Sequence, residues 1–270
     1  MRSPAVSVLV AAFALCPLYA ANTSKPDPSP EEIDKIIRTV ADTESAFAKA
    51  RENYTYRQTA KIQEFDEGGT PGGRFEVVTD IVFDDRGRRQ ERVVRAPSPT
   101  LRLIIMTPED EQDLRQIMPF VLTGDEASNY WVRYLGRQNA DEIPCYVFAI
   151  KPRKLESGKR YFTGQIWVDD RDLMVVKTYG RAIGAQKKGF DQQFPKFETY
   201  RQQVDGKYWF PVYTMANSTL YFADAHPSVK ETVKYEDYKQ FKAESKITVV
   251  DSTITPGEPA KTDKPEAPKK

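Results

Sequence analysis

The sequence predicts a mainly β (α+β) protein: a half-open antiparallel β-barrel or a strongly curved sheet of about ten strands, with an N-terminal helix and one inserted helix. From Tyr54 onward, apolar side chains recur at every second position, which is the period of a β-strand with one buried face. Turn-forming residues separate these segments, and Asp205-Gly206 is the strongest hairpin signal among them. Hairpins repeated at this spacing favour a barrel or a curved sheet.

The segment 30–50 has the period of a helix rather than of a strand. Ser29 can cap this helix, and Pro30 suits its first position. Glu31 and Glu32 favour the positive end of the helix dipole. The helix should present one apolar stripe, made by Ile33, Ile36, Ile37, Val40 and Phe47.

Strand-like segments follow one another through the rest of the chain. The predicted strands are 54–65, 74–83, 88–95, 129–136, 143–151, 160–168, 173–181, 196–204, 207–222 and 229–241. The Gly-rich segment 66–73 is a connection between the first two of them. We interpret the acidic segment 169–172 as a hairpin turn, because it lacks the glycine and the distal glutamate of a calcium loop.

A second helix is expected between the third and fourth strands. Thr107 is its cap, Pro108 suits the first helical position, and Asp110 is placed for a capping box. This helix should run to about Met118. The segment 119–128 is then a connector to the next strand.

The N-terminus has the features of an export signal. Arg2 supplies one positive charge, 5–15 is an uncharged, mainly apolar run, and Ala20 is a small residue where a signal peptidase would cut. The run is too short to cross a bilayer, which needs about 20 apolar residues. We therefore expect a cleaved signal peptide at 1–20 and a periplasmic protein, with an N-terminal anchor or a buried helix as the alternatives.

Lipid anchoring through Cys16 is the other alternative to a soluble exported protein. The residue before the cysteine would then be small, whereas Leu15 precedes Cys16 and Pro17 follows it. We therefore expect a soluble protein rather than a lipid-anchored one. After the signal peptide, the sequence predicts a polar leader at 21–29, a single β domain at 30–250 and a disordered tail at 251–270.

Charge and chemistry exclude several classes of function. The 40 basic and 39 acidic residues are interspersed, so nothing indicates a nucleic-acid partner. Once Cys16 is removed with the signal peptide, Cys145 stands alone in an apolar strand, where a buried, inert thiol is expected. His226 is the only histidine, which excludes multi-histidine metal sites. The sequence thus predicts no catalytic residues, no metal site and no cofactor, and we expect no enzymatic activity.

Several strands carry bulky side chains on both faces, although a sheet with one solvated face should alternate. The segments 130–135, 146–150 and 208–213 show this pattern. Both faces therefore need cover: helices could cover one, and the other would enclose an interior that is either filled by aromatic side chains or open to a lipid-sized ligand. The candidate ligand-binding residues are Trp131, Tyr146, Phe148, Phe162, Ile166, Trp209 and Tyr213.

Three neighbouring segments resemble a known family. They are 143–148 (Ile-Pro-Cys-Tyr-Val-Phe), 161–169 (Tyr-Phe-Thr-Gly-Gln-Ile-Trp-Val-Asp) and 173–177 (Leu-Met-Val-Val-Lys), and 208–211 (Tyr-Trp-Phe-Pro) adds a fourth match after the Asp-Gly turn. This pattern is similar to the LolA/LolB-like periplasmic lipoprotein carriers of outer-membrane lipoprotein sorting. By element order, the resemblance covers roughly 33–241.

The resemblance implies a half-open barrel closed by helices, with an apolar cavity that shields acyl chains from water. It implies an exported carrier whose partners are lipid or lipoprotein acyl chains. An envelope sensor similar to MucB and RseB, which binds a peptide or a membrane protein, is the alternative that this resemblance leaves open. Members of the carrier family hold a helical lid shut with one arginine, which the matching segments do not identify here.

Overall fold

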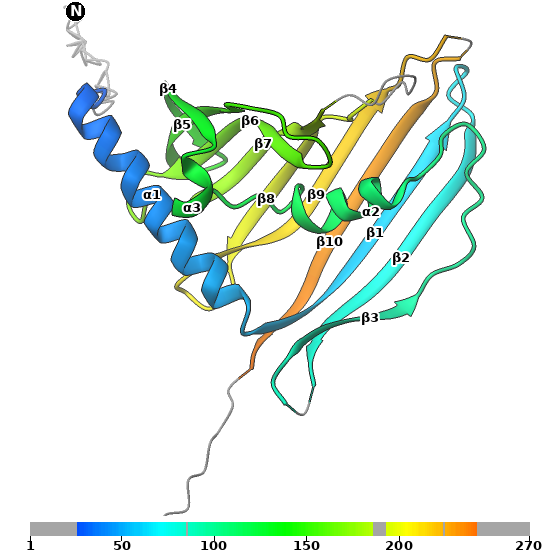
Figure 1. The fold of residues 1–270 in the computed structure, drawn as a ribbon, viewed down its shortest axis with the longest axis horizontal. Helices are drawn as coiled ribbons and strands as arrows, with labels where there is room; N and C mark the ends of the chain where they lie inside the picture. The colour runs from blue at the N-terminus through cyan, green and yellow to red at the C-terminus, as the bar shows by residue number, and fades with distance from the viewer. Residues whose placement is uncertain (1–25, 85, 186–192, 224, 242–270) are drawn as a thin grey trace, which may run out of the picture.

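Ten antiparallel strands form one open, curved sheet, and the helices lie against one of its faces (Figure 1). The computed structural model describes residues 26–84, 86–185, 193–223 and 225–241. The sheet order is β3-β2-β1-β10-β9-β8-β7-β6-β5-β4, so β3 and β4 are its two edges. The predicted fold class is confirmed. The predicted signal peptide at 1–20 and the predicted tail at 251–270 lie outside the described residues and stay predictions.

All ten predicted strands are present, with ends that differ from the prediction by a few residues. The strands are β1 Tyr54–Phe65, β2 Pro71–Phe83, β3 Arg89–Arg95, β4 Tyr130–Ala140, β5 Ile143–Pro152, β6 Arg160–Asp169, β7 Val175–Gly184, β8 Phe197–Gln203, β9 Trp209–Thr219 and β10 Ser228–Gln240. The first and last strands pair with each other over their whole length, from Tyr54 opposite Gln240 to Phe65 opposite Ser228.

Helix α1 spans Pro30–Arg51 and begins as the sequence predicts. The backbone N–H of Glu32 donates to the Ser29 hydroxyl at 3.3 Å, and the Glu32 carboxylate accepts from the Ser29 N–H at 2.7 Å. This reciprocal capping box satisfies two N–H groups that have no partner inside the helix. The apolar stripe turns toward the sheet, where Ile36, Val40 and Phe47 are buried.

The chain between β3 and β4, residues 96–129, crosses the face of the sheet that carries α1, and we call this segment the strap (Figure 1). It contains α2 (Pro108–Gln116) and α3 (Gly124–Ala127). The predicted capping box is present, since the Asp110 N–H donates to the Thr107 hydroxyl at 3.2 Å. The sequence did not indicate α3, because one helical turn is too short to show a period.

Polar side chains of the sheet hold the strap by its backbone. Because the partners are N–H and C=O groups, the strap's own side chains contribute nothing to these four contacts. The contacts are the Glu64 carboxylate with the N–H groups of Arg102 and Leu103 (2.9 Å each), Gln58 with the Leu114 carbonyl (3.1 Å), Thr199 with the Met118 carbonyl (2.7 Å) and Arg201 with the Phe120 carbonyl.

The two faces of the sheet have separate cores. The main core lies between the sheet, α1 and the strap. A smaller cluster occupies the opposite face, because side chains alternate along a strand and Val147 points away from Phe148. Cys145 belongs to this smaller cluster and is buried as predicted; burial raises the pKa of its thiol to about 12. Within the described part of the chain, no helix is both long and apolar enough to cross a membrane.

Candidate functional site

A cavity of about 400 Å³ lies between the strap and the sheet, within the size range of ligand pockets. Strands β1, β7, β8 and β10 and the chain after β9 form its floor, and the strap forms its roof. Apolar side chains dominate both surfaces. The floor includes Ile62, Ala182, Phe197, Leu220 and Val229, and the roof includes Leu103, Ile104, Ile105, Met106, Leu114 and Met118.

Three carboxyl groups interrupt this apolar wall, and no Lys, Arg or His is among the described residues that line it. Asp110 and Asp113 come from α2, and Glu231 comes from β10. Glu231 lies directly opposite Ile62 of β1 and Ala216 of β9. Because paired residues share a face, the Glu231 side chain points toward the strap from an otherwise apolar row.

Burial makes two of these carboxyl groups hard to ionise. It raises the pKa of Glu231 to about 7, and the nearby charges of Asp110 and Asp113 act in the same direction. Burial also raises the pKa of Asp113 to about 7; the Arg160 guanidinium opposes this shift, and the charges of Asp110 and Glu109 add to it. Both groups therefore change charge near neutral pH, inside an apolar cavity.

The Arg160 guanidinium contacts this acidic group but is not among the residues that line the cavity. The guanidinium is 3.4 Å from Asp110 and 3.8 Å from Asp113, and it also lies over the Phe194 ring. Arg160 lines a second, more polar cavity of about 660 Å³ between α1, the strap and the start of β6. Asp113 borders both cavities, so α2 is the partition between an apolar chamber and a polar one.

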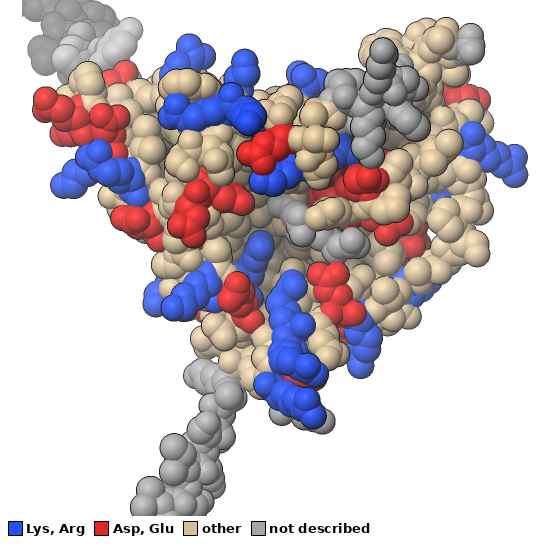
Figure 2. Space-filling model, viewed as in Figure 1, with Lys and Arg blue, Asp and Glu red and all other residues tan. Residues whose placement is uncertain are grey.

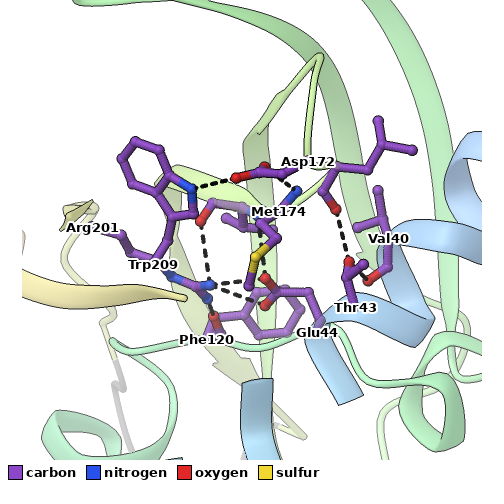
Figure 3. Close-up of polar contacts among 10 residues, drawn as sticks. Val40, Thr43, Glu44, Phe120, Asp172, Met174, Arg201 and Trp209 are labelled. Atoms are coloured by element: carbon purple, nitrogen blue, oxygen red, sulfur yellow. Dashed lines mark hydrogen bonds and ion pairs between the residues drawn. The ribbon is translucent and has the colours of Figure 1, made fainter. Parts of the chain in front are cut away.

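A buried ion pair joins α1, the sheet and the strap (Figure 3). The Arg201 guanidinium of β8 lies 2.9 and 3.1 Å from the two carboxylate oxygens of Glu44 on α1, and both side chains are at most 1% exposed. The Val175 N–H also donates to Glu44 at 3.2 Å. Because Arg201 also donates to the Phe120 carbonyl, one side chain holds both the helix and the strap on the sheet.

The acidic segment 169–172 lies at the turn between β6 and β7, as predicted, and this segment and the following Leu173 contact two other elements. The Thr43 hydroxyl of α1 donates to the Leu173 carbonyl at 2.8 Å, and the Trp209 indole N–H donates to the Asp172 carboxylate at 2.8 Å (Figure 3). Among the residues that the structure describes, no group of three or more His, Cys, Asp and Glu side chains could hold a metal ion.

The structure brings four of the seven candidate ligand-binding residues together. Tyr146, Phe148, Phe162 and Ile166 all belong to the main core, in which α1 packs on the sheet, and the last three are at most 1% exposed. None of the seven lines the apolar cavity beneath the strap. Their contact with a ligand stays a prediction.

The other three candidates lie apart from this group. Trp131 on the edge strand β4 is 58% exposed and has the Arg153 guanidinium 3.6 Å above its ring. Trp209 is partly buried and hydrogen-bonded to Asp172. Tyr213 is paired with Tyr200 across β8 and β9 and is partly buried.

Sequence reasoning missed the polar residues that build the site. Two of them break an apolar pattern and could have been found that way. Glu231 stands between Val229 and Val233 in a strand of period two, and Glu44 stands at helical spacing from Val40. A carboxylate at an inward position is costly to bury without a partner, so such a break in the pattern indicates either an ion pair or a ligand site.

Comparison with known proteins finds distant likenesses in structure. No family model and no curated protein matches the sequence. The fold is similar to a LolA superfamily protein from Nitrosomonas europaea (13% identity, 77% of this chain and 93% of that chain covered, TM-score 0.33). The fold is also similar to a putative outer membrane lipoprotein-sorting protein domain from Vibrio parahaemolyticus, with 12% identity, 76% of this chain and 93% of that chain covered, and a TM-score of 0.34. A chain of the Pseudomonas aeruginosa MucA/MucB complex is also similar, with 11% identity, 78% of this chain and 100% of that chain covered, and a TM-score of 0.22.

The expected resemblance to lipoprotein-sorting proteins is thus found again among solved structures. All three identities are 13% or lower and all three TM-scores are below 0.4, so these likenesses concern the fold at most. Function therefore has to be inferred from the site itself.

Proposed function

We propose that this protein is an exported periplasmic carrier that binds lipid or lipoprotein acyl chains in the cavity beneath the strap. The apolar cavity of about 400 Å³ is the observation that carries the proposal. Each methylene group transferred from water into such a site contributes about 0.8 kcal/mol, so a long chain can be held by burial alone.

The proposal includes export and an absence of catalysis. Export is supported by the signal-like order of Arg2, the apolar run 5–15 and Ala20. The absence of catalysis is supported by the burial of the Cys145 thiol, whose pKa of about 12 keeps it protonated, and by the exposed position of His226 beside Glu67. Sequencing the N-terminus of the protein recovered from the periplasm tests export; a start at Met1 would contradict it.

Filling the cavity tests acyl-chain binding directly. Ala182→Phe adds an aromatic ring to the cavity floor, and Val93→Phe adds an apolar side chain to the exposed strand β3 as the matched control. Solvent extraction and mass spectrometry of protein purified from its native envelope should find bound lipid in the wild type and in the control. The Ala182→Phe protein should carry several-fold less. Lipid-free wild-type protein, or equal lipid in both variants, would rule out this cavity as the site.

One observation favours the second candidate, an envelope sensor that binds a peptide or a membrane protein. All seven residues of the edge strand β3 are exposed, including Val93 at 60% and Val94 at 49%. An exposed edge can accept a further strand from a partner. Val93→Pro blocks such pairing, so loss of a captured envelope protein in this variant, with lipid content unchanged, would support the sensor over the carrier.

A further inference from the structure

The ionisable side chains among the described residues that line the cavity beneath the strap are all acidic. Among its described lining residues, Asp110, Asp113 and Glu231 are the only ionisable groups, and the remaining polar side chains are those of Thr107 and Gln193. An anionic head group placed here would meet three carboxyl groups and, among the described lining residues, no cation; the Arg160 guanidinium contacts Asp110 and Asp113 but is not part of the lining. A cationic head group would meet three potential partners in a medium of low dielectric constant.

Of the three carboxyl groups, that of Asp113 is incompletely paired within the protein, whereas Asp110 accepts hydrogen bonds from Thr107 and Arg160. Asp113 is 8% exposed, and its Oδ1 atom has no hydrogen-bond partner. Its ion pair with Arg160 is long, at 3.8 Å, while Arg160 approaches Asp110 more closely. A buried carboxylate oxygen without a donor costs free energy, and a ligand that supplies N–H groups would remove this cost.

Glu231 provides the second point of attachment, from the opposite wall. It projects from the floor between Val229 and Val233, whereas Asp113 belongs to α2 in the roof. The head group would thus lie between strap and sheet, and its chain would extend along the apolar lining. An ammonium group has three N–H donors and no acceptor, which matches several carboxyl groups that converge from two walls.

We propose that this cavity selects amphiphiles whose apolar chain ends in a primary ammonium group, and that it rejects chains ending in a carboxylate. The selectivity rests on the proposed function, because it assigns the head group to a cavity already assigned to the chain. Glu231 and Asp113 are the specificity-determining residues.

Three ligands of equal chain length test the selectivity: decylamine, decanol and decanoate. Each is titrated calorimetrically into the lipid-free wild-type protein at about pH 8, where the amine is protonated and the carboxyl groups are largely ionised. Decylamine should bind about tenfold or more tightly than decanol, and decanoate should bind most weakly. Decanoate binding as tightly as decylamine overturns the proposal.

Variants assign the selectivity to the named residues. Glu231→Gln keeps the size of the side chain and removes its charge, and it should weaken decylamine binding about tenfold while leaving decanol binding unchanged. Asp113→Asn should act in the same direction. Glu236→Gln is the matched control, since Glu236 lies on the same strand but is exposed and outside the cavity. Unchanged decylamine binding in both cavity variants overturns the proposal.

The ligand series separates failure of the selectivity from failure of the carrier function. Binding of decanol without a preference for decylamine contradicts only the selectivity. No binding of any ligand to the wild-type protein contradicts both. The wild-type series requires no substitution, so its result stands even if a variant fails to fold.

Discussion

Glu231 is placed so that its ionisation opposes folding. Burial raises its pKa from 4.5 to about 7, so the folded protein holds this proton more tightly than the unfolded chain does. Protonated Glu231 therefore stabilises the folded protein relative to the unfolded chain. This stabilising contribution to the free energy of unfolding is fully present below about pH 4.5 and is lost as the pH rises through about 7. Asp110 and Asp113 face Glu231 from the strap, and their negative charges also raise the Glu231 pKa.

Glu231→Gln should flatten this part of the pH profile. Between about pH 5 and about pH 8, the wild-type protein should lose more stability than the variant, by on the order of 2 kcal/mol. Urea unfolding followed by circular dichroism at a series of pH values measures the difference. Parallel profiles for the two proteins would mean that Glu231 ionises in the folded protein as it does in water.

Arg201 and Glu44 form a buried ion pair, in which each charge has the other as a direct partner, although burial still raises the Glu44 pKa. Arg201→Met should lower the free energy of unfolding by about 3–5 kcal/mol, because it leaves the Glu44 carboxylate buried without its cation. The double variant Arg201→Met with Glu44→Leu should recover a large part of this loss, since no charge is then left unpaired. Urea unfolding measures all three variants, and a double variant less stable than Arg201→Met would contradict this account.

At the scale of elements, Glu64 fastens the first part of the strap. Burial raises the pKa of Glu64. Hydrogen bonds from the N–H groups of Leu103, Arg102 and Gly73 together lower it by more than burial raises it, so the net pKa lies below the usual value. The stabilising contribution is therefore present above about pH 4.5 and is lost as the pH falls through the lowered folded-state pKa.

Glu64→Gln should loosen the strap without unfolding the sheet. The amide group offers one oxygen where the carboxylate offers two, and its NH₂ would face backbone donors, so a loss of about 1–3 kcal/mol is expected. Hydrogen exchange should accelerate at the Arg102 and Leu103 amides and stay slow at the Lys61 and Ile62 amides of β1. Equal acceleration at both places would show that Glu64 supports the whole sheet instead.

The elements were predictable where one local rule decides the outcome. Ser29 and Thr107 each begin a helix because a hydroxyl and a carboxylate three residues later satisfy the first N–H groups, and this pattern is local in sequence. The strands from Tyr54 to Gln240 were visible through their period of two. Periodicity identifies residues that share a face, but it does not say which strand is the neighbour, so the pairing of β1 with β10 was not predicted.

The site was largely unpredictable for the same reason. Glu44 and Arg201 are 157 positions apart, and only the folded sheet brings them together. The large aromatic side chains that drew attention in the sequence mostly fill the core, as Phe148 and Phe162 do. The cavity instead owes its chemistry to a few carboxyl groups, and a single carboxylate in a strand gives only a weak sequence signal.

For the molecule as a whole, Figure 2 shows basic and acidic side chains mixed over the face that carries α1 and α2, in keeping with the interspersed charges of the sequence. The last strand is central to the sheet rather than peripheral, because β10 lies between β1 and β9. A chain that ends at residue 227 would lose β10 and expose two long unpaired edges, and we expect it to aggregate.

A chain that ends at residue 250 keeps β10, lacks only the predicted tail at 251–270, and is the matched control for this truncation. The predicted tail is rich in Pro, Lys, Glu and Thr, so its removal should leave the unfolding midpoint within about 1 °C of the full-length value. Size-exclusion chromatography and thermal unfolding compare the two truncations. Aggregation of the longer one would assign the tail a structural role.

The neighbouring positions of β1 and β10 also set the order of events during biosynthesis. The two halves of the sheet cannot join until the chain has been made as far as Gln240, because β1 pairs with the last strand. Joining partners so distant in sequence is slow, since the intervening loop must first be closed. For a protein exported as proposed, this delay would keep the emerging chain incomplete, and so able to thread through a secretion channel, almost until its synthesis is finished.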